Sequence, residues 1–570
     1  MRLVASARLQ SASLGHPLPG AGAAEPITGI PSSQNKMALM TSCSEDVGPS
    51  DTVIVQVLDS LGRNRGGLTR AVFDRFRAVS EGRRAILVTV AFQSDVEELF
   101  DELKRDGSLP AHAELVSFHQ DLRRRTRQSR QRMVFEHPEW ESSPDFQSVS
   151  ENAASWSLRR YFASGAFVGL VGRAANGELR HVDRHDDARP WLRIYRDTGW
   201  PGGAIAKRDY FDDEGNVRFR TYVGVDECAY ISTWVNPGGY EYRTVEHTSG
   251  DPVLHNDMRW ANSAWLAGKL DEFGPAVVFS DEPRTSFALA ISSPDVFHVA
   301  SIHTTHYKNN RDNADGLKQW MKHHVEFIDN VGLFVFFTDT QRRDFIQDTG
   351  CPPERTTVVP HAAPLDPGAA LQRTVNRVEQ TFVTVARLTD DKQVDHAIRA
   401  FAKVHSAFPE SRYKIFGIGS AEAALRKVIS ECKLDGIVTL EGHTTEPLSQ
   451  FATADCSVLT SRYEGFGLVL TESFACGTPV ISYDVVYGPR DIVQHGHNGL
   501  LVPHGDIDAL ANSMIEYLQN PALRASLRAG AASTARRFGP DTWRQGWMST
   551  VSGRPTDGGE PLGHSGSLWP

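Results

Sequence analysis

Residues 461–484, SRYEGFGLVLTESFACGTPVISYD, place two glutamates on either side of a glycine-broken apolar run. Glu464 precedes a segment of helical character, Glu472 lies within it, and a Gly-Thr-Pro turn then leads into a short β-rich segment. A helix, turn and strand in this order are typical of domains in which helices and strands alternate. A glutamate pair alone is more often a loop residue and a helix-surface residue, so the neighbouring sequence has to decide its role.

Around this stretch the chain alternates between strand-like and helix-like segments with short loops. From about residue 381 the strand-like segments include TFVTVARL, YKIFGIG, GIVTLEG and NGLLVP, and the helix-like segments include VDHAIRAFAKVHSAF and DIDALANSMIEYL. Regular alternation of this kind predicts a doubly wound parallel sheet.

The same alternation appears near the beginning of the chain. A strand-like segment at residues 53–58 is followed by the loop GRNRGG and by helical periodicity, and a second strand and helix are expected at 85–91 and 96–104. The pattern resumes at residue 275. Two such domains, each with its strand ends facing a shared cleft, form a two-lobed α/β enzyme.

Between the two parts of the first lobe the pattern changes. Residues 207–223, KRDYFDDEGNVRFRTYV, alternate large and polar residues around a turn at 214–216, which predicts a β-hairpin. Several such segments between about residues 109 and 242 indicate an inserted antiparallel sheet. A basic run here is either a solvated helix face or a groove for a polyanionic acceptor. It comprises Arg123, Arg124, Arg125, Arg127, Arg130 and Arg132.

The composition excludes several classes of protein. The chain has 570 residues, enough for two or three domains, and with a formal charge of -10 nothing indicates a nucleic-acid binder. Its six cysteines contain no C-x-x-C pair, which argues for reduced thiols rather than a zinc site or disulfides. No apolar run approaches the roughly 18 residues of a membrane helix. We expect a cytoplasmic protein without an integral membrane segment, with peripheral attachment to the inner membrane face as the alternative.

Two cations near the start of the second domain indicate an anionic ligand. Arg387 closes the first expected strand, and Lys392 begins the next helix, where its charge opposes the helix dipole. A bound anion explains two cations at a strand end better than the fold does, with a chance surface lysine as the alternative. Each charge about 4 Å from an anion contributes on the order of 4 kcal/mol at an effective dielectric constant near 20. The pair would therefore stabilise a departing diphosphate without a metal.

The two glutamates fit the ends of the same ligand. If a helix begins near Gly467, its N-terminal amides point at the diphosphate. Carboxylates accept hydrogen bonds from hydroxyl groups, and eight helical positions rise by about 12 Å, roughly the distance from a sugar across two phosphates to a ribose. The stretch therefore predicts a nucleotide-sugar site.

The motifs EGFGLVLTESFACGTPVI and ARLTDDK together resemble the retaining glycosyltransferases of GT-B fold, of the family 4 type that contains sucrose synthase and mannosyltransferases. The resemblance covers residues 381–517 strongly. It implies that Arg387 and Lys392 hold the diphosphate, that Glu472 binds the ribose hydroxyls and that Glu464 faces the donor sugar. The donor-binding residues that it implies are Gly66, Gly67, Arg387, Lys392, Glu464, Phe466, Gly467, Leu468 and Glu472.

A histidine in the first lobe completes the implied catalytic set. The motif IHTTHYKNN supplies His303 and His306. A lone buried histidine is usually structural, but the family carries a histidine in this loop near the reacting hydroxyl and sugar, and His306 aligns with it better than His303. The catalytic residues that the resemblance implies are Glu464, His306, Arg387 and Lys392.

A narrower resemblance comes from SYDVVYGPRDIVQHGHNGLLVP and from the β-rich insertion. Both are similar to bacterial poly(glycerol-phosphate) and poly(ribitol-phosphate) α-glycosyltransferases and to accessory-secretion protein O-glycosyltransferases. The resemblance implies UDP-glucose or UDP-N-acetylglucosamine as donor and a cell-envelope polyol-phosphate polymer or protein as acceptor. The loop of Tyr487, Gly488 and Pro489 lacks the acidic residue usual in the wider family, so rules on sugar identity drawn from distant members do not carry over.

We expect no cofactor and no metal requirement. Without an obvious protein nucleophile, retention implies front-face substitution, in which the leaving phosphate takes the acceptor proton. Asp506-Ile507-Asp508 matches a metal-binding D-x-D string, but its place before a helix predicts capping. The alternatives are a non-catalytic partner of a protein glycosylation system, which would have lost a cation or a glutamate, and another GT-B activity such as a nucleotide-sugar epimerase or a phosphorylase.

These arguments divide the chain into six parts. The parts are a disordered N-terminal segment (1–50), the first part of the N-terminal lobe (51–108), a β-rich insertion for acceptor binding or homo-oligomerisation (109–245), the second part of the lobe (246–375), a C-terminal nucleotide-sugar-binding domain (376–540), and a crossing helix with a flexible tail (541–570).

Overall fold

The structure is a computed structural model that describes most of the chain. The described residues are 52–63, 67–125, 139–141, 143–153, 156–186, 188–189, 191–200, 204–248, 251–281, 283–308, 316–363 and 377–552. The predicted disordered segment 1–50, the predicted tail from residue 553, Gly66 and the arginines at 127, 130 and 132 lie outside these residues.

The first sheet has seven parallel strands in the order β17-β16-β15-β14-β1-β2-β3. Its central strands are apolar and buried on both faces, as a parallel sheet between two helical layers requires. The strands are β1 (Val53–Leu58), β2 (Ala85–Thr89), β3 (Glu114–Ser117), β14 (Ala276–Ser280), β15 (Val296–Ser301), β16 (Val331–Phe336) and β17 (Thr356–Val358). The helices of this lobe are α2 (Gly67–Val79), α3 (Val96–Arg105), α4 (Phe118–Arg124), α5 (Met258–Phe273), α6 (Gln319–Glu326) and α7 (Asp339–Thr349).

The expectation that the alternation breaks down at residue 109 is wrong. β3 pairs in parallel with β2, so the first part of the lobe continues to residue 117 and α4 follows it. β3 is only four residues long and begins with an exposed glutamate, so it lacks the apolar run that reveals the other strands.

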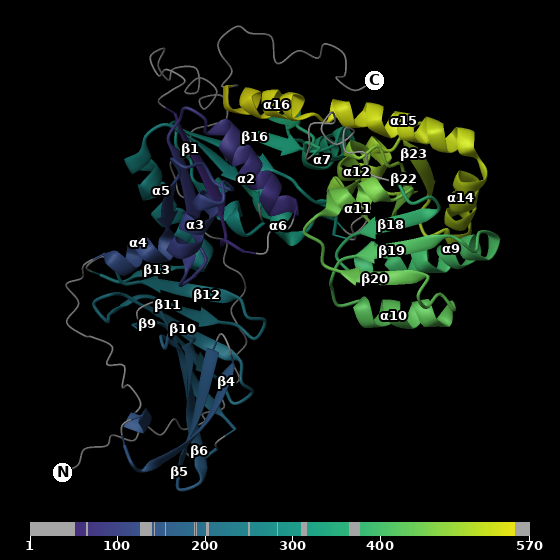
Figure 1. Ribbon diagram of the computed structural model, residues 1–570. Helices are drawn as coiled ribbons and strands as arrows, with labels where there is room; N and C mark the ends of the chain where they lie inside the picture. The colour runs from purple at the N-terminus through teal and green to yellow at the C-terminus, as the bar shows by residue number, and fades with distance from the viewer. Residues whose placement is uncertain are drawn as a thin grey trace, which may run out of the picture. The chain divides into compact units, whose positions relative to one another are not determined.

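The insertion is one antiparallel sheet of ten strands in the order β13 to β4, blue and teal in Figure 1. The predicted hairpin is confirmed as β9 and β10, and Gly215 in its turn has a φ of 83°. The strands are β4 (Phe146–Ala153), β5 (Trp156–Ala163), β6 (Ala166–Ala174), β7 (Leu179–His185), β8 (Arg193–Gly199), β9 (Ile205–Phe211), β10 (Val217–Val223), β11 (Ala229–Val235), β12 (Glu241–Glu246) and β13 (Val253–His255).

An aromatic row crosses five neighbouring strands of the insertion. Strand register places each member opposite the next, and alternate residues of a strand share one face. Ring centroids of neighbours on β8 to β11 lie 5.0–6.5 Å apart. The row, which ends in two exposed side chains, consists of Tyr195, Tyr210, Phe219, Trp234 and Tyr242.

The third sheet has six parallel strands in the order β20-β19-β18-β21-β22-β23. Every strand and helix expected between residues 381 and 517 is present. The strands are β18 (Thr381–Val385), β19 (Arg412–Phe416), β20 (Val438–Gly442), β21 (Cys456–Leu459), β22 (Val480–Asp484) and β23 (Gly499–Pro503). The helices are α9 (Val394–Ala407), α10 (Glu422–Glu431), α11 (Pro447–Thr453), α12 (Leu468–Ala475), α13 (Gly488–Ile492), α14 (Ile507–Gln519), α15 (Pro521–Arg537) and α16 (Pro540–Ser552).

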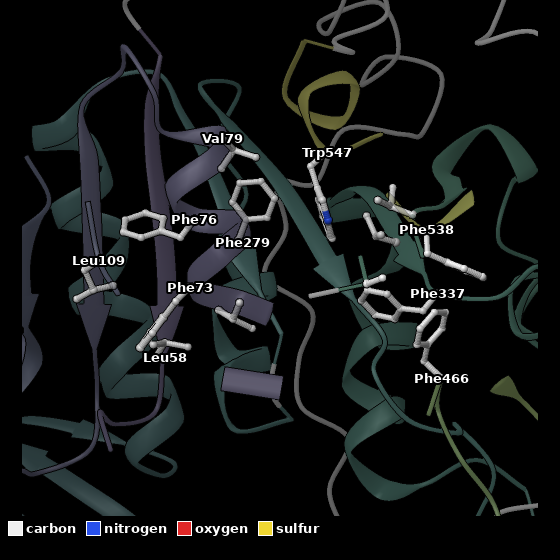
Figure 2. Packing of buried hydrophobic residues seen from close by; sticks show 14 of the residues in the cluster. Leu58, Phe73, Phe76, Val79, Leu109, Phe279, Phe337, Phe466, Phe538 and Trp547 are labelled. Carbon is white, nitrogen blue, oxygen red and sulfur yellow. The ribbon is translucent and has the colours of Figure 1, made fainter. Parts of the chain in front are cut away.

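One hydrophobic cluster joins the two parallel-sheet lobes. Figure 2 shows Phe73 and Phe279 of the first lobe, Phe466 of the second, and Trp547 of α16 within it. α16 packs against α2, so the last described helix returns to the first lobe. The lobes are therefore joined by buried apolar contacts beside the ends of their strands.

Candidate active site

A lysine and a glutamate from two loops form an ion pair at the edge of the second lobe. Lys392 ends a 3₁₀ turn (Asp390–Lys392) after β18, and Glu464 lies in the loop after β21. The Nζ atom of Lys392 is 2.8 Å from Oε1 of Glu464, and both side chains are 14% exposed. The hydroxyl of Ser461 donates to the same oxygen at 2.6 Å. The carboxylate thus holds the ammonium group in place.

The charge of Lys392 is secured by this arrangement. Burial acts to lower the pKa of its ammonium group, but the charge of Glu464 and its hydrogen bond outweigh burial, and the pKa is raised. Sequence analysis placed Lys392 in the first turn of a helix. Instead it ends the 3₁₀ turn before α9, which begins at Val394, so its charge lies outside the first turn of that helix.

Arg387 is the exposed member of this group. It lies two residues beyond the end of β18 on the same edge of the sheet. Its positive charge acts to lower the pKa values of both Asp391 and Lys392, which places it within electrostatic reach of them. The structure therefore brings Arg387, Lys392 and Glu464 to one edge.

Two helix N-termini meet beside this edge. α12 begins directly after Gly467, whose φ of 82° is in the left-handed region that glycine favours. α2 begins at Gly67, where a Cβ would lie 2.6 Å from the Leu468 side chain. The amides at the start of both helices carry partial positive charge, which suits an anion.

A groove of about 490 Å³ lies beside these two helices. Its lining includes Arg70 of α2, Glu472 of α12, and His361 from the segment after β17. Burial raises the pKa of the Glu472 carboxyl, and the charge of Arg70 offsets this only in part. Glu472 therefore lies in a groove that both lobes line, and Lys392 and Glu464 are not among its lining residues.

His303 lies at the other side of the junction, just beyond the end of β15. Its Nε2 is 2.8 Å from Oδ1 of Asp281, and its ring stacks on Phe337 with centroids 4.4 Å apart. His361 also stacks on Phe337, with centroids 4.0 Å apart, and its ring centroid lies 5.5 Å from that of His303. A Cβ at Gly465, the neighbour of Glu464, would overlap the carbonyl oxygen of His303. His303 therefore touches the loop that carries Glu464.

His306, the histidine favoured by the resemblance, is enclosed. Its Nε2 is 3.2 Å from Oδ2 of Asp348, and its ring stacks on Tyr487 of the second lobe with a centroid distance of 6.1 Å. Its side chain is fully buried, whereas that of His303 is 9% exposed. His306 makes a packing contact between the lobes, and its predicted catalytic role stays a prediction.

Several residues of this site were not singled out by sequence reasoning. Ser461 lies three residues before Glu464, the spacing of a loop hydrogen bond. His361 lies three residues beyond the end of β17, in VVPHAAP, which is the one signal that marks it. Lys318, with its Nζ 5.7 Å from the ring centroid of Tyr463, has its pKa lowered to about 8 by burial. Arg70 and Asp281 carry no local signal.

The structure bears on two further predictions from the sequence, those for the D-x-D string and for the basic run. Asp506 accepts a hydrogen bond from the Ala509 amide at 2.8 Å and so caps α14, as predicted for the D-x-D string. In the basic run, Arg123 lies over Trp200 at 4.2 Å, and Arg124 and Arg125 pair with carboxylates. The described part of the run is thus a paired helix face rather than a basic groove.

Within the described residues, no helix has both the length and the apolar character to cross a membrane. None of the five cysteines in this part of the chain forms a disulfide.

Comparisons with known proteins place this geometry in context. A family model described as Glycosyl transferases group 1 matches residues 372–534. The poly(glycerol-phosphate) alpha-glucosyltransferase of Bacillus subtilis is 30% identical over 516 residues, which cover 86% of this chain and 74% of that protein.

Two solved structures share the fold. A variant of TarM from S. aureus, in complex with fondaparinux, alpha-GlcNAc-glycerol and UDP, superposes with a TM-score of 0.70 at 19% identity and covers 88% of this chain and 99% of its own. The pneumococcal O-GlcNAc transferase GtfA, in complex with UDP and GlcNAc, gives 0.65 at 17% identity, with coverages of 88% and 99%. Both likenesses support the predicted GT-B architecture with its antiparallel insertion.

Proposed function

Because this chain belongs to the glycosyl transferases group 1, the family of the Bacillus subtilis poly(glycerol-phosphate) alpha-glucosyltransferase, we propose that it transfers glucose or N-acetylglucosamine from a UDP-sugar to a hydroxyl of a polyol-phosphate polymer. The observation that carries the proposal is the Lys392–Glu464 pair beside the N-terminus of α12. A fixed ammonium group, an exposed guanidinium at Arg387 and helix amides together suit a leaving diphosphate.

Each charged residue has a distinct role in this proposal. Lys392 and Arg387 neutralise the diphosphate as the bond to the sugar breaks, and the first amides of α12 donate to its oxygens. Glu464 orients Lys392 and faces the donor sugar, while Glu472 accepts hydrogen bonds from the ribose hydroxyls. Gly67 lets α2 approach the start of α12 closely. These are the roles that the family resemblance implies, and the positions and charges of the residues support them.

We propose that the reaction retains the configuration of the sugar and needs no metal. Glu464 already binds Lys392 and Ser461, which suits a positioning role better than nucleophilic attack on the sugar. Front-face substitution then has the leaving phosphate accept the proton of the acceptor hydroxyl. The positive charge that a metal would provide elsewhere is provided by the two cations and the helix amides. The name of the B. subtilis relative, an alpha-glucosyltransferase, supports retention.

The acceptor is proposed on chemical grounds as well. Lys318 adds a half-buried positive charge beside Tyr463, on the first-lobe side of the Glu464 loop, and a phosphodiester polymer would neutralise it. The likeness to GtfA makes a protein acceptor the second candidate. The intact Lys392–Glu464 pair favours a catalyst over a non-catalytic partner.

The test is nucleotide release from a panel of UDP-, GDP- and ADP-sugars in EDTA, with and without poly(glycerol phosphate). We expect UDP release that depends on Lys392, so Lys392→Ala abolishes it. Lys403→Ala is the matched control, because Lys403 is an exposed lysine that pairs with Asp508 on the outer helices. An α-linked product identifies retention. Epimerised sugar with free UDP but no transfer, or loss of activity in EDTA that a divalent metal restores, would overturn the respective part of the proposal.

A further inference from the structure

A buried ion pair lies directly behind His303. The guanidinium of Arg75, from α2, makes two 2.6 Å contacts with the carboxylate of Asp281, at the end of β14. The two side chains are 2% and 0% exposed. Arg75 also donates to Gln56 and to the Ser301 hydroxyl, and it lies over the rings of Phe279 and Trp547. Asp281 is thereby held as a carboxylate, which can only accept hydrogen bonds.

This carboxylate decides which nitrogen of His303 carries the proton. Oδ1 of Asp281 is 2.8 Å from Nε2 of His303, and because the oxygen only accepts, Nε2 must donate. In a neutral imidazole the other nitrogen, Nδ1, is then an acceptor. Nδ1 is buried and has no hydrogen-bond partner among the described residues. Buried polar atoms in native structures are nearly always paired, so this acceptor at the lobe junction suits a ligand hydroxyl. Nδ1 of His306 has no partner within the described part of the chain either, but the His306 side chain is fully buried and stacked on Tyr487.

We propose that Asp281, held in place by Arg75, is a positioning residue that fixes His303 in the tautomer protonated on Nε2, so that Nδ1 accepts a hydrogen bond from a hydroxyl of the donor sugar or acceptor. This inference rests on the proposed transferase function and deepens it. It names His303, rather than His306, as the histidine that touches the reacting groups.

The surroundings of the ring support this assignment. Phe337 and His361 form a stack with His303, and His361 lines the groove that contains Glu472. The main chain of His303 abuts Gly465, next to Glu464. The stack fixes the plane of the imidazole ring. The hydrogen bond to Asp281 fixes how the ring is rotated within that plane. The ring therefore has one orientation at the place where the loop of Glu464 meets the first lobe.

His306 offers a matched comparison within the same loop. It also contacts a carboxylate, that of Asp348, but its side chain is fully enclosed and stacks on Tyr487. Asp348 belongs to α7, away from the buried Arg75 pair. If the loop histidine acts on substrate, replacing the two aspartates separately shows which histidine it is.

The experiment compares Asp281→Asn with Asp348→Asn in the full chain, with kcat and KM for UDP-sugar and poly(glycerol phosphate) measured across pH. We expect Asp281→Asn to lower kcat by about tenfold or more while KM for the UDP-sugar stays within about twofold, as for the loss of a residue that orients a functional group. Asp348→Asn should leave kcat within about threefold, because Asp348 contacts the fully buried His306 and not His303.

The pH profile separates positioning from mere structural support. The charged and titratable groups that face His303 are Asp281, Arg75 and His361. The Asp281 carboxylate favours the protonated imidazolium, and a protonated Nδ1 cannot accept a hydrogen bond. Without this carboxylate the pKa of His303 falls further, so the acid limb of kcat should move to lower pH in Asp281→Asn. A purely structural defect lowers kcat without moving that limb.

A second variant separates loss of positioning from misfolding. It is needed because Asp281→Asn leaves Arg75 buried without a counter-charge. The double variant Arg75→Gln, Asp281→Asn removes both charges and keeps hydrogen-bonding groups, and it should show the same shift of the acid limb. The proposal is overturned if both variants keep wild-type kcat, if the limb does not move, or if Asp348→Asn causes the loss instead. Failure of the proposed function is distinct, because then the wild-type chain releases no nucleotide from any sugar.

Discussion

The two parallel-sheet lobes use charge in opposite ways at the ends of their strands. In the first lobe, Arg75 and Asp281 are sealed from solvent and bound to each other. In the second, Lys392 and Glu464 remain partly exposed, and Arg387 beside them is open to solvent. Burying an ion pair costs desolvation energy that the attraction often only balances, so the sealed pair is better explained by orientation of His303 than by stability. The open charges remain available to a ligand.

The largest effect should come from the open charges. Lys392→Met removes a fixed cation beside the proposed diphosphate, and we expect kcat for UDP release to fall by about 10²–10³-fold, as when one stabilising donor is lost from an active site. Steady-state kinetics measures this. The circular dichroism spectrum should be unchanged. Equal losses in Lys403→Met would show that the effect is not specific to the site and would erase the contrast between the lobes.

The next largest effect is expected at Gly465, where the loop that carries Glu464 contacts the main chain of His303. Gly465→Ala introduces a Cβ that overlaps the carbonyl oxygen of His303, so the Glu464 loop has to move away from the first lobe. Misplacing catalytic groups by about 1 Å can cost about 10²-fold in rate, and the strain should lower stability by about 1–3 kcal/mol. Turnover and thermal unfolding test both. Gly268→Ala, in the exposed face of α5 with open space around it, is the control and should raise stability slightly.

A smaller effect is expected at Glu472, and it depends on pH. Burial raises the pKa of this carboxyl, so it protonates at a higher pH than an ordinary glutamate. Ribose hydroxyls bind the carboxylate form. Donor affinity should therefore be complete above the raised pKa and weaken as pH falls through it. Glu472→Gln should raise KM for the UDP-sugar by about tenfold, the value of one charge-assisted hydrogen bond, and remove this pH dependence. A KM that varies with pH equally in both proteins would disprove the role of Glu472.

The smallest effect on donor turnover should come from the aromatic row of the insertion. We expect the double variant Trp234→Ser, Tyr242→Ser to change UDP release without acceptor by less than about twofold, because distant sites act independently. If the insertion binds the acceptor as predicted, transfer to poly(glycerol phosphate) should fall instead. If it mediates self-association, the mass by light scattering should change. A matching loss in the acceptor-free assay would show that the insertion contributes to donor binding.

The second lobe could be predicted from sequence almost completely. Most of its strands are apolar runs bounded by turn residues, and most of its helices have a buried stripe, so local pattern and final structure agree. The cations and glutamates of the site were found in the same way, from their positions at strand and helix ends. Their pairing was not, because Lys392 and Glu464 are 72 residues apart and meet through the order of strands in the sheet.

Less of the first lobe could be predicted from sequence, because its key contacts join residues that are far apart in the chain. Arg75 and Asp281 are 206 residues apart, with the whole insertion between them. The sequence near either residue does not predict the ion pair, since Arg75 resembles any other charged residue on an amphipathic helix. β3 was missed for a related reason, because its position between a buried strand and a helix, rather than its own composition, makes it a strand.

The return of α16 to the first lobe has a consequence for biosynthesis. The ring of Trp547 lies 4.8 Å from the guanidinium of Arg75, and Arg544 pairs with Glu81. Domains generally fold in order as they leave the ribosome. Here, the cover over the ion pair behind His303 is made from residues that are translated after both parallel sheets. The nascent first lobe must therefore wait, with that side of its interior open, until the second lobe and α16 have emerged.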